Sequence, residues 1–408
     1  MNSPWSQSLR SALYLCSAIR RRIPRSGLRS VLVILAVALS SSVPTRAQRT
    51  KDQGEFSRFA GDAPRRARPY ANDLSAVLAR KNVSVALARV ADWQLKRAEQ
   101  HFDNDWTFAV LYAGFMAIPE AVAGDKYQQA MKSMGYSLHW APGPDELDAN
   151  DLAVGQTYLA LFELDKNPVM IQQFKDRVDA VLSHAPTQPR PLWWWCDALF
   201  MAPAALAELS RITGDQRYLE YMDKQWWMTS SQLYDSKHAL YFRDQRFLTR
   251  QEANGEPIFW SRGNGWVLAG LARVLKAMPR DYPSRPRYVA QFQQMAASLA
   301  ALQRPNGLWT AGLLDAASYP SDETSGSALI AYGLAYGVNS GLLDRAKYQP
   351  DVELAWHGLL AHIFVDGRLG SIQKVADSPG HVKPTSSYVY GVGAFLLAGS
   401  EVYVMAPE

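Results

Sequence analysis

A repeated segment constrains the fold of this chain more than any other feature. The stretch Phe115-Met116-Ala117-Ile118-Pro119, followed by Gly124-Asp125, recurs as Phe200-Met201-Ala202-Pro203, followed by Gly214-Asp215. The first phenylalanines of the two copies are 85 residues apart. This spacing is too long for one helical hairpin and fits two hairpins of roughly 40 residues each. Each Gly-Asp step is interpreted as the end of one helix and the N-cap of the next.

Apolar residues recur with helical spacing through most of the chain. Segments 151–162 and 204–209 show this spacing, and strict alternation of apolar and polar residues is rare. Further helices are expected at 263–275, 326–336 and 390–404. A count of about twelve helices predicts an all-α domain, in which six hairpins close into a ring with the inner helix ends around one cleft.

Residues 1–47 have the order of a secretory signal peptide. They contain seven arginines and no acidic residue, and the apolar run 31–39 is followed by small residues up to Ala47. The apolar run is too short for a spanning helix, so we expect cleavage, a secreted or periplasmic location and no stable membrane association afterwards. An uncleaved membrane anchor is the alternative.

The remaining chain is expected to form a polar tether over residues 48–71 and one domain over 72–408. No Pro/Gly/Ser-rich linker interrupts the second range. Beyond the leader, 36 basic side chains stand against 38 acidic ones, out of 43 and 38 in the whole chain. This balance argues against nucleic acid as a partner, because the basic excess lies in the leader.

The segment from Trp193 to Trp266 places a carboxylate and a guanidinium among aromatic rings. Trp193, Trp194 and Trp195 precede Asp197. Tryptophan rings stack on the C–H faces of sugars, and a carboxyl group among such rings favours its protonated, acid form. The combination indicates carbohydrate chemistry. The alternative for Asp197 is a simple helix N-cap.

The second half of that segment, Phe259 to Trp266, contains Arg262. Arginine binds carboxylates in bidentate fashion, and Gly263 and Gly265 are expected to let the backbone approach a ligand. A structural role for Arg262, bridging loops, is the alternative. Asp148 and Asp151 precede the helix that begins near residue 153, and one of them is expected to be a cap.

We expect neither a cysteine nucleophile nor a histidine-based metal site in this protein. Cys196 is the single cysteine after the leader, and it is interpreted as a small buried hydrophobe in preference to a nucleophile. The histidines lack paired ligand spacing, so we expect no metal site. We also expect no organic cofactor. The histidines are His101, His139, His184, His238, His357, His362 and His381.

A series of motifs resembles glycoside hydrolase family 105, the unsaturated rhamnogalacturonyl hydrolases. They run in order from about Trp93 to Val404, at 197–202, 233–235 with 241–244, 259–266, 323–326 and 390–401. The family fold is an (α/α)6 barrel, in agreement with the hairpin count above. The resemblance makes 72–408 a catalytic domain and an oligosaccharide its partner.

The resemblance implies an unusual hydrolysis of lyase-generated, rhamnogalacturonan-type oligosaccharides. Their terminal uronic acid carries a C4=C5 double bond, which the enzyme protonates at C4 and hydrates at C5, so that the resulting hemiketal releases a keto acid. Asp197 matches the proton donor and Asp151 the second catalytic acid. Arg262, Trp260 and Trp266 match substrate-pocket positions, and Trp195 and Arg243 are also assigned to substrate binding.

The chain departs from the family at one acidic position. Family members usually show an Asp pair preceded by His-Ala, whereas this chain reads Asp148-Ala149-Asn150-Asp151. Three alternatives remain open: an unsaturated glucuronyl hydrolase acting on glycosaminoglycan fragments, a non-catalytic sugar-binding relative favoured by Asn150, and a lyase or epimerase. The last is the least favoured, because it needs His or Tyr bases that the sequence does not place.

Overall fold

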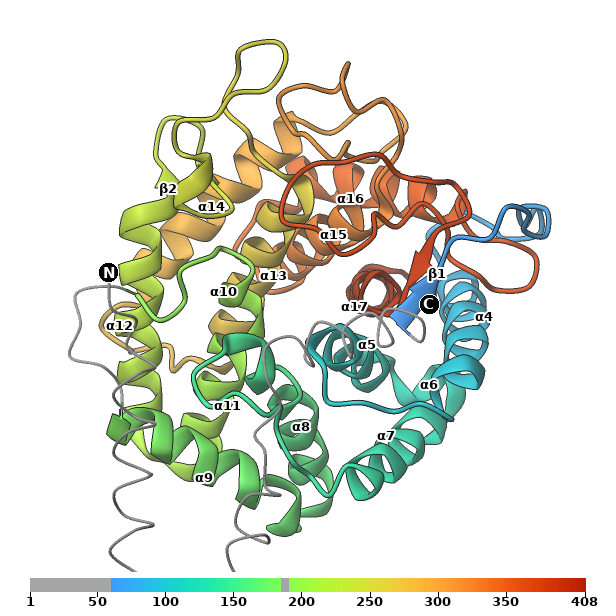
Figure 1. The fold of residues 1–408 in the computed structure, drawn as a ribbon. Helices are drawn as coiled ribbons and strands as arrows, with labels where there is room; N and C mark the ends of the chain where they lie inside the picture. The colour runs from blue at the N-terminus through green and yellow to red at the C-terminus, as the bar shows by residue number, and fades with distance from the viewer. Residues whose placement is uncertain (1–59, 185–190) are drawn as a thin grey trace, which may run out of the picture. The chain divides into compact units, whose positions relative to one another are not determined.

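The computed structural model describes residues 60–184 and 191–408, so the predicted signal peptide and residues 48–59 of the predicted tether lie outside the described ranges. Within these ranges, twelve helices of at least 11 residues form two concentric rings (Figure 1). The arrangement confirms the predicted all-α (α/α)6 barrel.

Six helices form the inner ring. Each contacts the next along the chain, and the last contacts the first, so the ring is closed. Side chains on nearly every face of these helices are buried, which explains their apolar, alanine- and glycine-rich sequences. The inner helices are α5 (Trp106–Ala117), α8 (Gly155–Asp165), α11 (Pro203–Thr213), α13 (Ser261–Ala277), α15 (Thr324–Asn339) and α17 (Val389–Met405).

Six amphipathic helices surround this ring. In α4, for example, Val83, Leu87 and Val90 are buried at helical spacing against α17, while the opposite face is polar. The outer helices are α4 (Arg80–Ala98), α7 (Lys126–Ser137), α9 (Val169–His184), α12 (Gln216–Leu233), α14 (Arg285–Ala301) and α16 (Arg345–Leu360). Short helices α6 (Glu120–Ala123), α10 (Ala198–Met201), η1 (Ala149–Leu152) and η2 (Gln245–Phe247) lie in the connections.

The repeated Gly-Asp steps lie at equivalent places in the barrel. Gly214 ends α11 with φ +76°, and the Asp215 side chain accepts a hydrogen bond from the N–H of Arg217 at the start of α12. Gly124 precedes α7, where Asp125 stands at the N-cap position without a side-chain capping bond. Both steps join an inner to an outer helix, two hairpins apart, as the 85-residue spacing predicted.

Close contact between inner helices depends on glycine. A Cβ atom added to Gly393 of α17 would lie 2.3 Å from the carbonyl oxygen of Val110 in α5, and one on Gly114 would lie 2.7 Å from that of Gly393. On α13, a Cβ at Gly270 would lie 2.2 Å from the carbonyl oxygen of Leu199 in α10. These positions therefore fix the distance between neighbouring helices.

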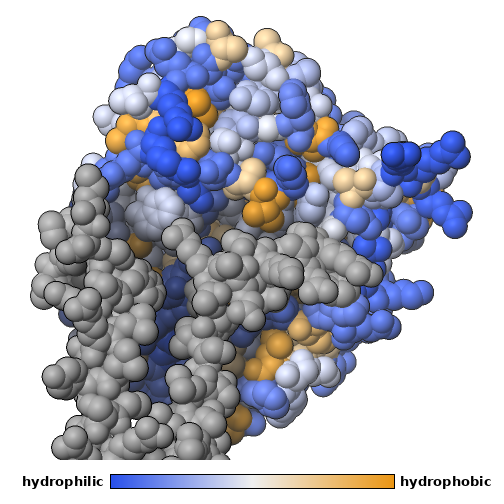
Figure 2. All heavy atoms as spheres, in the orientation of Figure 1, coloured by the Kyte–Doolittle hydropathy of each residue, from blue (hydrophilic) through white to orange (hydrophobic). Residues whose placement is uncertain are grey.

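Residues 60–71 pack on the barrel, in contrast to the tether predicted for 48–71. Strand β1 (Gly61–Asp62) pairs antiparallel with β4 (Ser387–Tyr388), and the N–H groups of Ala71 and Val365 bond the carbonyls of Ile363 and Pro69. A second pair joins β2 (Tyr234–Asp235) to β3 (Leu240–Tyr241). Among the described residues, no helix is both long and apolar enough to cross a bilayer. The face in Figure 2 is mainly hydrophilic, with small separate hydrophobic groups.

Candidate active site

The N-terminal ends of the inner helices meet at one end of the barrel. The Trp106 ring at the start of α5 lies 6.3 Å from that of Trp266 near the start of α13 and 5.3 Å from that of Tyr390 near the start of α17. The 3₁₀ helix η1 contacts both α5 and α10 at this end. Backbone N–H groups and helix dipoles pointing toward one place favour binding of an anion.

Asp197 lies at this end, held by pairing between two distant segments. The N–H of Cys196 donates to the carbonyl of Arg243 at 2.8 Å, and Trp195 forms a β-bridge with Asp244. This pairing places the Arg243 guanidinium beside the Asp197 carboxylate, with Nε 3.3 Å from Oδ2. The structure thus brings together two of the residues that the sequence predicted for the site.

The Asp197 carboxylate has no role in capping α10. It stands at the N-cap position, but its side chain accepts no hydrogen bond from the helix. Asp197 is 8% exposed, and the thiol of Cys196 donates to its Oδ2 over 3.6 Å. The alternative of a simple N-cap is therefore not supported, and the carboxylate remains available for chemistry.

Asp244 and Arg246 fix the orientation of Arg243. Arg243 Nη1 donates to Asp244 Oδ2 at 2.8 Å, and Arg246 also donates to this carboxylate. Although burial acts to raise it, hydrogen bonds from Arg246 and Arg243 hold the pKa of Asp244 at about 2. Arg243 Nε itself is buried without a hydrogen-bond acceptor. Its Nε instead faces Asp197 as an ion pair, so the guanidinium charge lies directly beside that carboxylate.

Trp194 provides the exposed aromatic surface of the site, although the sequence analysis did not assign it. Its ring is 52% exposed, and the Arg243 guanidinium lies 5.5 Å from its centroid. Trp193 and Trp195, by contrast, are 1% and 6% exposed. Alternate residues of an extended segment point to opposite sides, so the sequence Trp193-Trp194-Trp195 contained the signal that only one or two of these rings could face solvent.

Asp151 is the second acidic residue at this end. Burial raises its pKa to about 6, against the effect of the Asp145 N–H that it accepts, and Asp148, Asp145 and Asp105 raise it further. Asp148 instead caps η1, accepting from the N–H of Asn150 at 2.9 Å. The expectation that one acid of this pair is a cap is confirmed.

Arg262 binds backbone carbonyls. It is 1% exposed, and its guanidinium donates to the carbonyls of Gln373 and Lys374 at 2.8 and 2.9 Å while lying over the rings of Trp260 and Tyr390. These contacts favour the structural interpretation, in which Arg262 bridges the start of α13 to the loop before α17. Direct binding of a substrate carboxylate by Arg262 is not supported.

Trp260 and Trp266, each 1% exposed, are also covered by protein. Trp260 Nε1 donates to Gln373 Oε1, and Trp266 packs on Phe200 with ring centroids 4.8 Å apart. Neither ring is free to stack on a sugar, which corrects their assignment to the pocket. They were misassigned because a buried aromatic residue and a sugar platform look alike in sequence.

Gly263 and Gly265 likewise serve packing. A Cβ on Gly263 would lie 3.2 Å from Cys196 Sγ, and one on Gly265 would lie 2.8 Å from Leu329 Cβ, so the predicted approach to a ligand is wrong. Cys196 is fully buried, and burial followed by the Asp197 charge raises its pKa well above the usual value. The thiol therefore stays protonated, as expected for a structural residue.

A match to the family described as Glycosyl Hydrolase Family 88 spans residues 81–406. The chain belongs to this family. It is a glycoside hydrolase, and the resemblance drawn from its motifs is confirmed. The chain is 38% identical over 317 residues to the unsaturated 3S-rhamnoglycuronyl hydrolase of Formosa agariphila, covering 73% of this chain and 84% of the relative.

Two further relatives of this family 88 member support the same conclusion. The unsaturated rhamnogalacturonyl hydrolase YesR of Bacillus subtilis is 26% identical over 299 residues, which cover 69% of this chain and 83% of YesR. The solved structure of a glycosyl hydrolase family 88 protein from Bacteroides vulgatus superposes with a TM-score of 0.75 at 30% identity. That likeness covers 80% of this chain and 99% of the solved chain.

Proposed function

We propose that this hydrolase removes a terminal 4,5-unsaturated uronic acid linked to rhamnose, and that Asp197, Arg243, Trp194 and Asp151 form its active site. The observation that carries the proposal is the Asp197 carboxylate, which is 8% exposed, caps no helix and lies 3.3 Å from Arg243. Rhamnose as the neighbouring sugar is supported by the names of both enzyme relatives, which share a rhamnosyl unit.

Arg243 and the surrounding helix ends account for recognition of the uronate. The Arg243 guanidinium beside Asp197 can pair with the substrate carboxylate, and the N-terminal ends of the inner helices favour the negative charge of that carboxylate. The exposed face of Trp194 offers a flat apolar surface to the sugar ring. A saturated neutral sugar would make only the last of these contacts.

Asp197 is assigned the proton transfer. It donates a proton to C4 of the substrate double bond, water adds at C5, and the hemiketal collapses to a keto acid and the shortened oligosaccharide. When the substrate carboxylate binds Arg243, it competes with Asp197 for the guanidinium, so that binding frees the catalytic carboxyl from its ion pair. Asp151, with a pKa of about 6, is ionised at neutral pH and is assigned to the activation or positioning of water.

The test compares two unsaturated disaccharides. One carries rhamnose next to the unsaturated uronate, and the other is a glycosaminoglycan disaccharide with a hexosamine in that place. Loss of the ultraviolet absorbance of the double bond is the readout. We expect turnover of the rhamnose-linked compound at least tenfold faster in kcat/KM; preference for the glycosaminoglycan fragment would contradict the proposal.

Export of the protein is a separate part of the proposal. Its support is the basic segment, the apolar run 31–39 and the small residues up to Ala47. Expression of the full chain in a bacterium with periplasmic export, followed by N-terminal sequencing of the periplasmic fraction, should give a protein that begins after Ala47. A full-length protein retained in the membrane fraction would instead identify an uncleaved anchor.

A further inference from the structure

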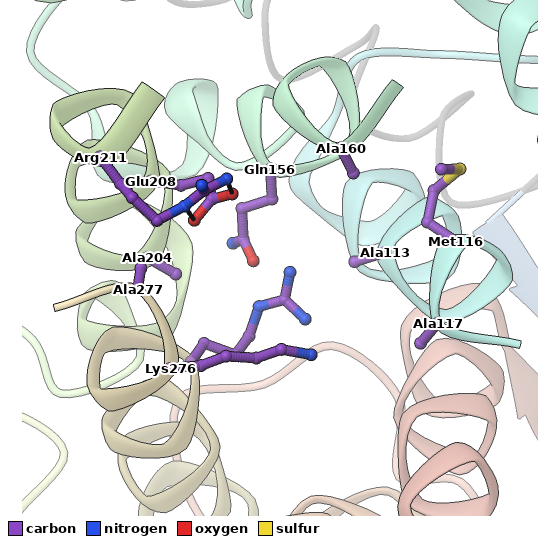
Figure 3. A pocket seen from close by; sticks show the side chains of 11 residues that line it. Ala113, Met116, Ala117, Gln156, Ala160, Ala204, Glu208, Arg211, Lys276 and Ala277 are labelled. Atoms are coloured by element: carbon purple, nitrogen blue, oxygen red, sulfur yellow. Dashed lines mark hydrogen bonds and ion pairs between the residues drawn. The ribbon is translucent and has the colours of Figure 1, made fainter. Parts of the chain in front are cut away.

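A cavity lies within the barrel, lined mostly from the C-terminal halves of the inner helices, and Asp197 is not among its lining residues. It has a volume of about 330 Å³, within the range of small-molecule sites. Alanines at positions 113, 117, 160, 204 and 277, from four inner helices, leave the space open because their side chains are small. Met116 and the polar residues Gln156, Glu208, Arg211, Arg273 and Lys276 complete the lining (Figure 3).

The charge of this cavity is positive. Arg211 is neutralised by Glu208 and Glu163, with nitrogen–oxygen distances of 2.5 and 2.7 Å. No ion pair with a carboxylate is found for Arg273 or Lys276 in the part of the chain that the structure describes, and Arg273 lies over the Phe200 ring, 5.9 Å from its centroid. Two cations therefore line the cavity without an acidic partner, which favours an anionic ligand.

Unpaired polar atoms reach the same space. Gln156 is only 5% exposed, and its side chain points from α8 into the cavity (Figure 3). Its amide nitrogen donates to the carbonyls of Phe200 and Met201, but its Oε1 is buried and accepts no hydrogen bond. Nε of Arg273 is also buried without an acceptor. Buried polar atoms are normally hydrogen-bonded, so each of these two atoms lacks a partner that it would be expected to have.

One type of ligand could supply both missing hydrogen-bond partners, an acceptor for Arg273 Nε and a donor for Gln156 Oε1. An oxyanion can accept from Arg273 Nε and pair with Lys276, and a hydroxyl group beside it can donate to Gln156 Oε1. We propose that this cavity binds a small hydroxylated anion of the sugar acid or sugar phosphate class. Asp197 does not line this cavity, and the hydrolysis proposed above does not require its occupation.

Isothermal titration calorimetry on the purified enzyme tests this site. The probes are glucuronate, glucose 6-phosphate, inorganic phosphate and glucose. Glucuronate or glucose 6-phosphate should bind more tightly than phosphate and glucose, and the tighter of the two identifies the anionic group. Equal affinity for phosphate, or binding of none of the probes at millimolar concentration, would overturn the proposal.

Charge-changing variants show where the probe binds. Arg273→Gln should raise Kd at least about tenfold, as expected for loss of a charged hydrogen bond. Lys276→Gln should raise it a few-fold, and Lys224→Gln on α12 serves as an exposed control with no change. Glu208→Gln should lower Kd, because it removes the acidic residue that lines the cavity. A general loss of folding cannot produce these opposite signs.

Binding at the active site would give a different pattern. The Kd for glucuronate would then be the same in wild type, Arg273→Gln and Glu208→Gln. That result would overturn the assignment of the cavity while leaving the proposed hydrolysis untouched.

Discussion

The Asp197 carboxylate, like that of Asp125 but unlike those of most acidic residues at helix starts, caps no helix. The side chains of Asp105, Asp215 and Glu323 each accept a backbone N–H of the helix that follows. Asp197 instead contacts Cys196 and Arg243. A carboxylate that does not stabilise its helix can be changed without loss of the fold, which makes its catalytic role testable by mutation.

Asp197→Asn should therefore keep the melting temperature of the wild type and lose about 10²- to 10⁴-fold in kcat, the usual value of general acid catalysis. Asp215→Ala is the matched control. It removes the capping bond to Arg217 and should cost about 1 kcal/mol in unfolding free energy with unchanged kcat. Near-normal turnover of the Asn variant would show that Asp197 is not the proton donor.

Asp151 is expected to make stability depend on pH. Its pKa is about 6 in the folded protein, mainly because of burial, against 3.8 in its ordinary state. The folded state thus holds this proton more tightly, so stability falls as the pH rises from about 4 to about 6, and the full cost remains at neutral pH. Asp151→Asn removes the ionisation and should raise the melting temperature at neutral pH, with the difference shrinking toward pH 4.

Differential scanning calorimetry at several pH values checks this expectation, with the exposed Asp281→Asn as control. The pH profile of kcat/KM gives a second measurement. If Asp151 acts in catalysis, the ionisation near pH 6 should be absent from the profile of any active Asp151→Asn enzyme. A constant difference in melting temperature from pH 4 to pH 8 would show that Asp151 is not the titrating group.

At the scale of secondary-structure elements, the start of α13 acts as a connector between helices. Arg262 holds the 373–374 carbonyls, and Asn264 bonds the backbone N–H and carbonyl of Tyr241 in β3. These contacts join α13 to the segments that position Arg243 and the loop before α17. The motif 259–266 therefore has a structural role, in which it holds the segments around the active site in position.

Arg262→Lys keeps the charge but cannot reach both carbonyls in the same way. We expect a lower melting temperature, with a cost of about 1–3 kcal/mol for each buried group left unsatisfied. The preference for a free over an esterified uronate should stay the same, because Arg262 does not bind the carboxylate. Selective loss of activity on the free acid would return Arg262 to the substrate pocket.

Gly270 sets the distance between α13 and α10. Alanine normally stabilises a helix interior by about 1 kcal/mol relative to glycine, but a Cβ here would lie 2.2 Å from the Leu199 carbonyl oxygen. Gly270→Ala should therefore destabilise the protein and reduce kcat, since α10 follows directly after Asp197. An increase in melting temperature would contradict this close packing.

Helix positions could be predicted from sequence because apolar residues recur with the period of a helix wherever one face of that helix is buried. The expected helices at 263–275, 326–336 and 390–404 lie within α13, α15 and α17. The site was harder to predict, since Asp197 and Arg243 are joined by backbone pairing between distant segments. Trp260 and Trp266 could not be separated from true sugar platforms, because composition does not distinguish a buried ring from an exposed one.

For the whole molecule, the barrel separates two environments. The N-terminal helix ends surround Asp197, while the 330 Å³ cavity lies toward the C-terminal ends. The parallel direction of the inner helices explains why the first end suits an anionic substrate. At the second end, where the helix dipoles are unfavourable to anions, the side chains of Arg273 and Lys276 must supply the positive charge.

The central claim is that the enzyme acts on the C4=C5 double bond and not directly on the glycosidic bond. The most direct test is the rate of release of the rhamnose-containing product from an unsaturated disaccharide and from its saturated counterpart with the same linkage, measured by mass spectrometry. We predict release from the unsaturated compound alone, because the saturated ring has no carbon that can accept the proton from Asp197. Comparable cleavage of the saturated disaccharide would contradict the account and indicate an ordinary pair of glycosidase carboxylates.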